Sequence, residues 1–238
     1  MKLQLRPIMF ALLVMLLAAA VATVWFTMPH EAHPAQYVAV LGLSYLLGSV
    51  PWGYMLLVWR RGLDIREYGS GRTGMSNVLR TAGGKTAGLV FALDLGKGVL
   101  AVLLARFIIG DRGAEVAAGL LVLIGHNWPV FLQFRGGRGT ATGAGGLATM
   151  APIAAVVGTF GFILATLLSR YLSLGSIAGV IASSFSLLAL VLLGLYDSTY
   201  TVYGFLGGAI IIWQHRDNIR RIRQGKERRL GNPATKLN

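Results

Sequence analysis

Cysteine is absent from this chain of 238 residues, and only 13% of its residues are charged. The lack of cysteine excludes disulfides, thiol nucleophiles and cysteine metal sites. Soluble domains carry about 25% charged residues, whereas this chain is 55% hydrophobic with a mean hydropathy of +0.63. The composition therefore predicts an integral membrane protein.

Acidic residues are also few, at 9 against 22 lysines and arginines, which gives a formal net charge of +13. Such an excess can indicate a nucleic-acid partner, but the sequence shows no motif of a nucleic-acid-binding fold. Basic loops of a membrane protein instead follow the positive-inside rule and contact anionic headgroups. We therefore expect membrane lipid as a partner and no nucleic acid.

Several patterns of common enzyme sites are missing as well. No Gly-x-Ser-x-Gly elbow occurs, so a hydrolase-type serine nucleophile has no local support. None of the four histidines has an aspartate five positions on, which disfavours the acyltransferase class that uses His-x-x-x-x-Asp. No spacing indicates a zinc site. We expect neither a metal nor a cofactor.

Apolar runs of about 20 residues are long enough to cross a bilayer as helices. The sequence predicts spans, or parts of spans, at residues 8–28, 37–59, 86–109, 116–134, 140–150 with 152–168, 177–195, and 199–213. The segment 140–150 is short and rich in glycine, so we expect it to form a short or re-entrant arm of a helical hairpin with 152–168. The predicted fold class is an all-α polytopic membrane protein.

The first run allows two interpretations. Its basic start, its apolar core and the small residues at 20–22 are typical of a signal peptide with its cleavage site. The apolar run continues past that point through Trp25 and Phe26, so we favour an uncleaved helix. Residues 1–36 then form an additional N-terminal segment that ends in an external linker.

The distribution of positive charge predicts the topology. All but three of the 22 lysines and arginines fall on the two termini or on alternate loops, the exceptions being Lys97, Arg106 and Arg112. Positively charged loops face the cytoplasm. We therefore expect both termini and the polar loops on the cytoplasmic side of a bacterial inner membrane, with a membrane domain at residues 37–231 and a tail at 232–238.

A polar stretch at residues 69–98, GSGRTGMSNVLRTAGGKTAGLVFALDLGKG, interrupts the apolar sequence. Its G-x-G-x-x-G pattern follows a membrane helix and not a β-strand, which excludes a dinucleotide site. A P-loop is excluded because Leu79 occupies the position of its first glycine. Glycine-rich turns that lead into a helix still bind anions, and Ser76, Asn77 and Arg80 add polar groups one helical turn apart. The stretch therefore predicts a phosphate-binding loop.

Polar residues elsewhere in the spans leave alternatives open. Asp94 and Lys97 lie three positions apart on one predicted helix and form either part of a site or a buried structural pair. His126 either contributes to a site or satisfies a backbone carbonyl. Proline and glycine at residues 48–53 interrupt a span, as a packing kink or as a substrate contact.

The segment that leaves the last predicted span has the pattern His215-x-x-Asn218-x-x-Arg221, which places three polar groups on one helix face. Histidine is a natural general base near neutral pH because its unperturbed pKa is about 6.5. An interfacial helix on lipid headgroups is the alternative. We prefer that alternative for the basic residues that follow, and a functional site for His215 and Asn218.

Five blocks of this sequence together resemble the acyl-phosphate-dependent glycerol-3-phosphate acyltransferases of bacteria, the PlsY type. In chain order the blocks are GSVPWGY at 48–54, GSGRTGMSNVLRTAG at 69–83, LDLGKG at 93–98, GHNWPVF with FRGGRGTATG at 125–143, and HRDNIRRIRQGKE at 215–227. Each block is moderately specific, but their occurrence in this order in a small polytopic protein is highly specific. The resemblance implies a seven-helix core, to which the leading span is an addition.

The resemblance also implies a reaction, the transfer of a fatty acyl group from acyl phosphate to the 1-hydroxyl of glycerol 3-phosphate. The products are lysophosphatidic acid and phosphate, at the entry to phospholipid synthesis, and a functional link to the enzyme that makes acyl phosphate follows. The catalytic residues expected here are Ser70, Arg80, Arg138, His215 and Asn218. The expected substrate-binding residues are Gly69, Gly71, Ser76, Asn77, Lys97, His126, Asn127, Gly136, Gly137, Gly139, Thr142, Ser173 and Ser176.

Three positions depart from the usual family pattern. Arg72 replaces an asparagine, Ser76 replaces a threonine, and Arg138 stands where lysine is common. Arginine keeps the positive charge of lysine but presents it as a planar fork, so these changes bear on substrate preference. Two rival functions are a transporter of anions or phospholipids, which places polar groups near the midplane in repeated halves, and an inactive paralogue that serves as a scaffold.

Overall fold

The protein is described by a computed structural model that covers residues 34–237. The predicted span at 8–28 and most of its linker lie outside the described residues. The helices in chain order are α2 (Pro34–Ser49), α3 (Trp52–Arg61), η1 (Ile65–Glu67), α4 (Met75–Ala82), α5 (Gly84–Ile108), α6 (Arg112–Asn127), η2 (Val130–Leu132), α7 (Thr140–Met150), α8 (Pro152–Ser169), α9 (Leu172–Leu192), α10 (Tyr200–Val202), η3 (Tyr203–Gly207), α11 (Gly208–Gln214) and α12 (Arg216–Arg223).

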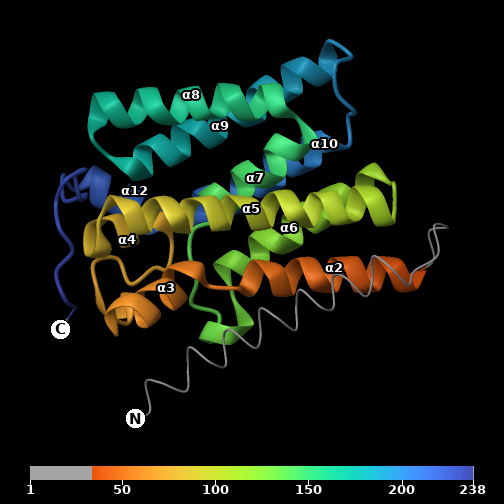
Figure 1. Cartoon of the computed structure of the whole chain (residues 1–238). Coiled ribbons are helices and arrows are strands. Elements are labelled where there is room, and N and C mark those ends of the chain that lie inside the picture. The colour runs from red at the N-terminus through yellow and green to blue at the C-terminus, as the bar shows by residue number, and fades with distance from the viewer. Residues whose placement is uncertain (1–33, 238) are drawn as a thin grey trace.

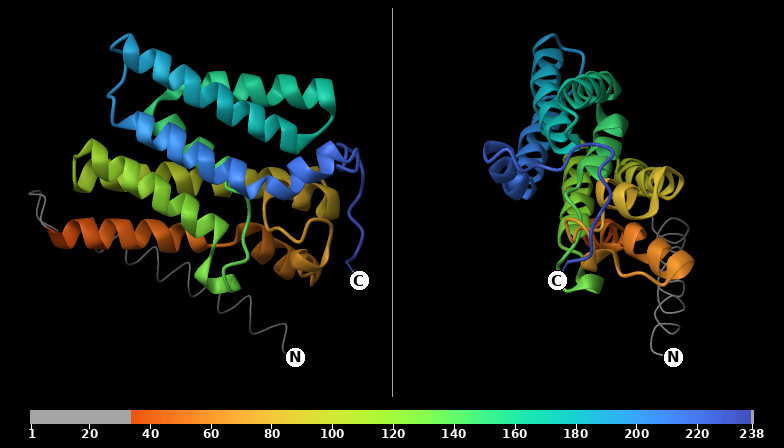
Figure 2. Two further views of the ribbon diagram at one scale, coloured as in Figure 1. Left: turned by 180° about the vertical axis from the view of Figure 1, so that it is seen from behind. Right: turned by 90° about the vertical axis from the view of Figure 1, so that its left-hand side faces the viewer.

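The long helices lie side by side and run along one common direction (Figure 1). One side of the bundle is formed by α2 and α3, the middle by α5, α6 and α7, and the opposite side by the α8–α9 pair. The short helices α4 and α12 and the C-terminal tail gather at one end (Figure 2). The bundle therefore has one end built mostly of loops and short helices.

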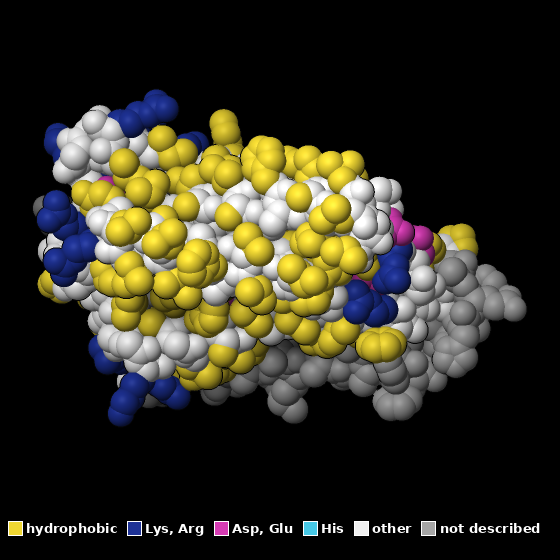
Figure 3. Space-filling model, turned by 90° about the horizontal axis from the view of Figure 1, so that it is seen from above, with side chains coloured by type: hydrophobic (Ala, Val, Ile, Leu, Met, Phe, Trp, Pro, Cys, Tyr) yellow, Lys and Arg dark blue, Asp and Glu magenta, His cyan; other side chains and the backbone are white. Residues whose placement is uncertain are grey.

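Four helical segments are long and apolar enough to cross a membrane: α5, residues Arg112–Leu132, α8 and α9. The pair α2 and α3, bent by 41°, is a fifth when counted as one broken span. Apolar side chains cover most of the flank seen in Figure 3, whereas lysines and arginines lie toward its ends. The prediction of an all-α polytopic membrane protein is confirmed for the described part of the chain.

The break between α2 and α3 occurs in the interrupted stretch predicted at residues 48–53. Pro51 lacks an N–H and cannot continue the hydrogen-bonding pattern of α2. The carbonyl groups freed there are satisfied by a side chain from another helix, because Lys97 Nζ donates to Gly48 O at 2.8 Å and to Val50 O at 3.1 Å. A buried lysine thus stabilises the break.

The span predicted at 116–134 has different limits. Helix α6 begins earlier, at Arg112, because the Asp111 side chain caps it by accepting a hydrogen bond from Ala114 N at 2.8 Å. It ends at Asn127, because Trp128 precedes Pro129 and such a residue is driven out of the helical region. The segment beyond is the short helix η2 and a loop that returns toward the bundle.

The segments 140–150 and 152–168, expected to form one helical hairpin, contact each other, but each packs mainly on a different neighbour. Helix α7 packs on α5, where added side chains at Gly98 and Gly145 would collide with backbone atoms of the facing helix. Helix α8 packs mainly on α9. The α8–α9 pair therefore forms a separate layer, as Figure 1 shows, and α7 belongs to the middle layer.

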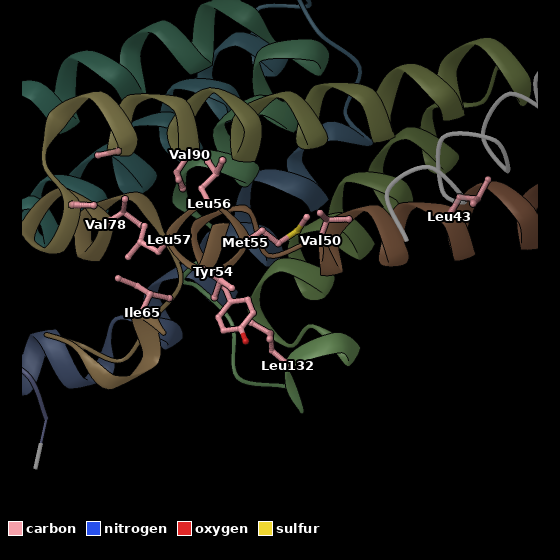
Figure 4. Close-up of a cluster of buried hydrophobic side chains, with 13 residues drawn as sticks. Leu43, Val50, Tyr54, Met55, Leu56, Leu57, Ile65, Val78, Val90 and Leu132 are labelled. Carbon is pink, nitrogen blue, oxygen red and sulfur yellow. The ribbon is translucent and has the colours of Figure 1, made fainter. Parts of the chain in front are cut away.

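A hydrophobic cluster holds the loop end of the bundle together (Figure 4). Met55 and Leu57 of α3 are fully buried and pack with Ile65 of η1, Val78 of α4 and Val90 of α5. Large-to-small changes at such sites typically cost about 2–5 kcal/mol. The cluster fixes α4, and the glycine-rich loop before it, against the membrane helices.

Candidate functional site

A cavity of about 360 Å³ lies between α4, α5, α7, the α8–α9 pair and the helix formed by η3 and α11. One end is polar. The polar residues that line that end are Ser70, Arg72, Ser76, Asn77, Asp94, His126, Arg138, Ser176 and His215. The rest is lined mainly by apolar and glycine residues, including Leu147, Ala155, Phe162 and Gly207. The cavity therefore offers a charged head and an apolar body.

The first wall of the polar end is the glycine-rich loop. Gly69 and Gly71 adopt positive φ angles of 57° and 67°. Residues that carry a side chain disfavour such angles, whereas glycine adopts them readily. Asn77 holds the loop from within, because its Oδ1 accepts from Ser70 N at 3.1 Å and its Nδ2 donates to the carbonyls of Tyr68 and Arg72 at 2.9 and 3.0 Å. Asn77 therefore shapes the loop.

The Ser70 side chain has no hydrogen-bond partner in the described residues, whereas its backbone N–H is bonded to Asn77. Its Oγ is buried and makes no hydrogen bond within residues 34–237, although it lines the cavity. A buried hydroxyl without a partner costs free energy unless something binds it. The geometry thus presents a free hydroxyl at the cavity.

The second wall is the loop of residues 136–139, which is held by the end of α6. Gly136 N donates to Asn127 O at 3.2 Å, and Gly137 N donates to His126 O at 3.0 Å. A side chain at Gly137 would collide with the His126 ring. His126 and Asn127 therefore position this loop mainly through their carbonyl groups and, for His126, through packing of the ring.

Arg138 extends from this loop into the cavity. Its Nε is buried and has no hydrogen-bond partner among the described residues. Burial lowers the pKa of Arg138, and the nearby charges of Arg72 and Arg221 lower it further. A guanidinium in this setting gains most from an anion that satisfies its free donors.

Arg80 and Arg72 add positive charge around the same end. Burial is the main cause that lowers the pKa of each guanidinium. Arg80 lies on α4 beside the cavity lining, with its Nη2 donating to Arg228 O at 3.1 Å and its Nε unsatisfied within the described range. Arg72, one of the three departures from the family pattern, lines the cavity itself.

His215 forms the third wall, at the end of α11. Its Nδ1 lies 2.8 Å from Ile211 O. Because a carbonyl oxygen can only accept, this contact places the proton of the neutral ring on Nδ1 and leaves Nε2 as an acceptor. Burial lowers the pKa of His215 to about 4, with a further contribution from Arg138. The ring is therefore neutral near pH 7 and able to accept a proton.

Ser173 and Asn218 contact a residue that the sequence analysis assigned no role. Glu227 Oε1 accepts from Ser173 Oγ at 2.9 Å and from Asn218 Nδ2 at 2.7 Å, and its Oε2 accepts from Arg221 Nε at 2.7 Å. Glu227 thereby joins α9, α12 and the tail. The sequence feature that could have indicated this role is that Glu227 is the one glutamate in the strongly basic segment 215–238.

Lys97 does not line the cavity. Its ammonium group is buried among the carbonyls of Gly48 and Val50 and lies 3.1 Å from Asp94 Oδ1. Asp94 also lies 3.5 Å from His126 Nδ1, and these two residues do line the cavity. Of the two roles left open for the Asp94–Lys97 pair, the lysine takes the structural one.

The remaining predicted residues fall into two groups. Gly139 and Ser176 line the cavity, together with the residues described above. Residues that support the walls without lining the cavity are Gly69, Gly71, Arg80, Asn127, Gly136, Gly137, Thr142, Ser173 and Asn218. Within the described residues, no group of three His, Asp or Glu side chains is arranged to hold a metal ion.

A model of the glycerol-3-phosphate acyltransferase family matches residues 38–225. The chain belongs to this family. The family resemblance proposed from the five sequence blocks is confirmed, and the protein is therefore related to a group of acyl-transferring enzymes of the membrane. Residues after 225, which include Glu227, lie outside the matched region.

Relatives and a solved structure agree with this assignment. The chain is 48% identical over 210 residues to glycerol-3-phosphate acyltransferase 3 of Dehalococcoides mccartyi, with 82% of this chain and 96% of that protein covered. It is 42% identical over 190 residues to the glycerol-3-phosphate acyltransferase of Thermoanaerobacter pseudethanolicus, with 79% and 93% covered. The crystal structure of PlsY in its glycerol 3-phosphate form matches with a TM-score of 0.75 and 36% identity, over 82% of this chain and 96% of that one.

Proposed function

We propose that the protein transfers a fatty acyl group from acyl phosphate to the 1-hydroxyl of glycerol 3-phosphate, forming lysophosphatidic acid and phosphate for phospholipid synthesis. One observation carries the proposal: a single cavity joins unsatisfied cationic and hydroxyl groups to a long apolar body. Such a cavity matches substrates that combine a phosphate with an acyl chain. The charge distribution further supports a cytoplasmic location of the polar end, in a bacterial inner membrane.

The polar end has groups suited to two phosphates. Arg138, which lines the cavity, and Arg80, which lies beside the lining, each retain a buried Nε without a partner, and Ser70 Oγ is free in the described chain. Arginine binds phosphate through parallel N–H groups. Glu227 supplies negative charge nearby, but its two oxygens are already engaged by Ser173, Asn218 and Arg221. An anionic substrate would satisfy the donors that remain.

The apolar body suits a fatty acyl chain. The helix formed by η3 and α11 lines it between Tyr203 and His215, which lies at the polar end. These residues are twelve positions apart, so the lined distance is at most about 18 Å at the α-helical rise. The walls there are mostly small residues of α7, α8 and α9 and of the helix formed by η3 and α11, which leave room between the helices.

The proposed step is a displacement at the acyl carbonyl carbon. The substrate hydroxyl oxygen forms a bond to that carbon, the bond from the carbon to the phosphate oxygen breaks, and phosphate leaves. The hydroxyl proton moves to His215 Nε2 or to a phosphate oxygen of a substrate. Because acyl phosphate is a mixed anhydride, positioned donors and orientation supply most of the needed stabilisation.

The rival transport function fits the arrangement less well. A transporter is expected to bind its substrate near the midplane, between repeated halves. Here the polar lining residues gather where α4, the two glycine-rich loops and the start of α12 meet, at the loop end of the bundle. This arrangement supports a reaction at the membrane surface.

The test is acyl transfer to labelled glycerol 3-phosphate by the purified protein in lipid, without added metal. Acyl phosphate, acyl-CoA and acyl carrier protein thioester are compared as donors, and we expect product from acyl phosphate alone. Ser70→Ala and His215→Ala should each lose most turnover and remain folded. Ser198→Ala, at an exposed site in the turn before α10, is the matched control. Near-normal turnover in both site variants would contradict the assignment.

A further inference from the structure

The C-terminal strap, residues 228–237, runs antiparallel to the start of the glycine-rich loop. Gly69 N donates to Thr235 O at 2.9 Å, and Leu237 N donates to Glu67 O at 2.8 Å. These two bonds flank the isolated bridge between Tyr68 and Lys236. The strap thus pairs through one β-bridge with the start of the loop that carries Ser70, at the end of the bundle where Figure 2 shows the tail.

The strap also binds the backbone of Arg80. Ala234 N donates to Arg80 O at 3.0 Å, while Arg80 Nη2 donates to Arg228 O at 3.1 Å. Arg228 in turn donates from its Nη2 to Gly69 O at 3.1 Å. Residues of one short segment therefore hold two of the predicted site elements, the glycine-rich loop and Arg80, at the same time.

Most of the contacts use backbone atoms of the loop and of Arg80, and the one functional atom that the strap engages is Arg80 Nη2, through Arg228 O. Ser70 Oγ and Arg80 Nε are buried and have no hydrogen-bond partner in the described chain, whereas the carbonyl and N–H of Gly69 and the carbonyl of Arg80 are all bonded to the strap. Ser70 Oγ and Arg80 Nε thus remain available for a ligand while the backbone beside each of them is held. This pattern is typical of preorganisation.

Packing adds a second constraint on the loop. Gly69 has a φ of 57°, and an added Cβ there would lie 3.1 Å from the Cβ of Ala234 and would collide with Asn77 Oδ1. The loop is therefore enclosed between Asn77 on its inner side and the strap on its outer side. Glycine-rich loops have high conformational freedom when unconstrained, so both contacts restrict it.

We propose that the C-terminal strap is a positioning element, which orders the glycine-rich loop and Arg80 for binding of a substrate phosphate. The strap lies beyond residue 225, where the match to the family model ends. The expected effect of the strap on kcat/KM rests on the proposed acyl transfer. The expected ordering of the Gly69 amide does not depend on that proposal.

The test compares backbone variants of the strap in the full chain, reconstituted in lipid. Ala234→Pro removes the N–H that donates to Arg80 O, whereas Thr235→Pro removes an N–H that bonds to nothing in the described residues. A chain that ends at Gly231 removes most of the strap but keeps Glu227 and Arg228. Hydrogen exchange of the segment 67–72 and kcat/KM for glycerol 3-phosphate are measured for each.

We expect faster exchange at residues 67–72 in Ala234→Pro and in the shortened chain, with unchanged exchange in α8. Misplacement by about 1 Å can lower turnover about 100-fold, so we expect kcat/KM to fall about 10- to 100-fold in both, and less than about 2-fold in Thr235→Pro. Lys236→Ala removes only an exposed ion pair of 3.8 Å with Glu67 and should leave both readouts unchanged.

Unchanged exchange and turnover in the shortened chain would overturn the inference. Equal losses in Ala234→Pro and Thr235→Pro would also overturn it, because proline itself would then be the cause. If the wild-type chain transfers no acyl group, the proposed function fails, and the exchange of residues 67–72 alone decides the role of the strap.

Discussion

His215 Nδ1 lies 2.8 Å from the carbonyl oxygen of Ile211, one helical turn earlier on α11. This contact fixes the tautomer of the ring and places the free lone pair on Nε2. His215 Nε2 is therefore the nitrogen available to the cavity that the ring lines. A single backbone contact thus decides which ring nitrogen can accept a proton.

The first prediction concerns pH. Because burial lowers the pKa of His215 to about 4, the ring stays neutral as the pH falls from 7 and becomes protonated only near pH 4. We expect the part of kcat/KM that depends on His215 to persist down to about pH 5 and to be lost as the pH falls through 4. An unperturbed histidine would instead lose it near pH 6.5.

The measurement is the ratio of kcat/KM between the wild type and His215→Ala from pH 4 to 8. Titration of the substrate phosphate is common to both proteins and cancels in this ratio. The variant should be about 10²- to 10⁴-fold slower at pH 7, the usual contribution of a general base. A ratio that already falls at pH 6.5 would contradict the described environment of the ring.

The second prediction concerns Arg138. Its buried Nε has no partner in the described residues, so the ligand-free protein carries the cost of a desolvated cation. We expect Arg138→Met to raise the melting temperature of the ligand-free protein and to lower kcat/KM about 10²- to 10³-fold, the usual loss for one charge-stabilising donor. Arg138→Lys keeps the charge and should lose less.

Thermal unfolding in detergent, with and without glycerol 3-phosphate, checks this prediction. Ligand should stabilise the wild type and should stabilise Arg138→Met much less. Arg135→Met is the matched control, since Arg135 is exposed in the same loop. A melting temperature that falls in Arg138→Met would show that the guanidinium stabilises the ligand-free fold.

The third prediction concerns the length of the acyl chain and rests on the proposed reaction. Tyr203 lines the cavity far from His215, is 4% exposed, and donates from its hydroxyl to Gly143 O at 2.9 Å. Tyr203→Leu should deepen the apolar body and shift preference toward longer acyl phosphates. Competition among acyl phosphates of different length measures the shift.

Tyr203→Phe is the control for this substitution. It keeps the volume of the ring but removes the hydrogen bond to Gly143, so it should lower stability by about 1 kcal/mol and leave the preferred length unchanged. An equal shift in both variants would mean that the hydroxyl, and not the volume of the ring, sets the preference.

The fourth prediction concerns Lys97, which lies 3.1 Å from Asp94 and is nearly inaccessible to solvent. Lys97→Met removes the ammonium partner of Asp94, which keeps only His126 beside it, and leaves the carbonyls of Gly48 and Val50 without their donor. Breaking a buried pair in this way costs about 3–5 kcal/mol. Adding Asp94→Asn should recover part of the loss, since the uncompensated charge is removed.

Equilibrium unfolding in mixed micelles measures these differences. Lys85→Met, at an exposed position near the start of the same helix, should change stability by less than about 0.5 kcal/mol. If Lys97→Met unfolds at the wild-type denaturant concentration, the lysine does not stabilise the break between α2 and α3.

The residues of the polar cavity came from sequence segments far apart in the chain. Ser70, Arg138 and His215 stand in three different blocks, and the structure brings all three to one cavity. Glycine-rich loops and cations were visible in each block, so these candidates could be chosen before the fold was known. These residues can meet only if the three segments lie at the same end of the bundle. The order of the predicted spans, with basic loops on alternate sides, already indicated that they do.

Other residues could not be placed in this way. Lys97 was grouped with the substrate-binding residues, but it donates to carbonyls of the break between α2 and α3. Helical spacing identifies neighbours on one helix, but it does not identify which backbone groups of another helix lie opposite. The contacts of Ser173 and Asn218 with Glu227 could not be predicted for the same reason, because they join different segments of the chain.

The sequence by itself determined the membrane class, most of the spans, the positively charged end and the family. These features depend on local composition, because lipid as a solvent selects apolar runs and the membrane sorts charge by side. Only the tertiary structure decided that α8 pairs with α9, that Glu227 joins three segments and that the C-terminal strap lies on the glycine-rich loop. Those contacts depend on packing and hydrogen bonds between distant residues, which no local pattern specifies.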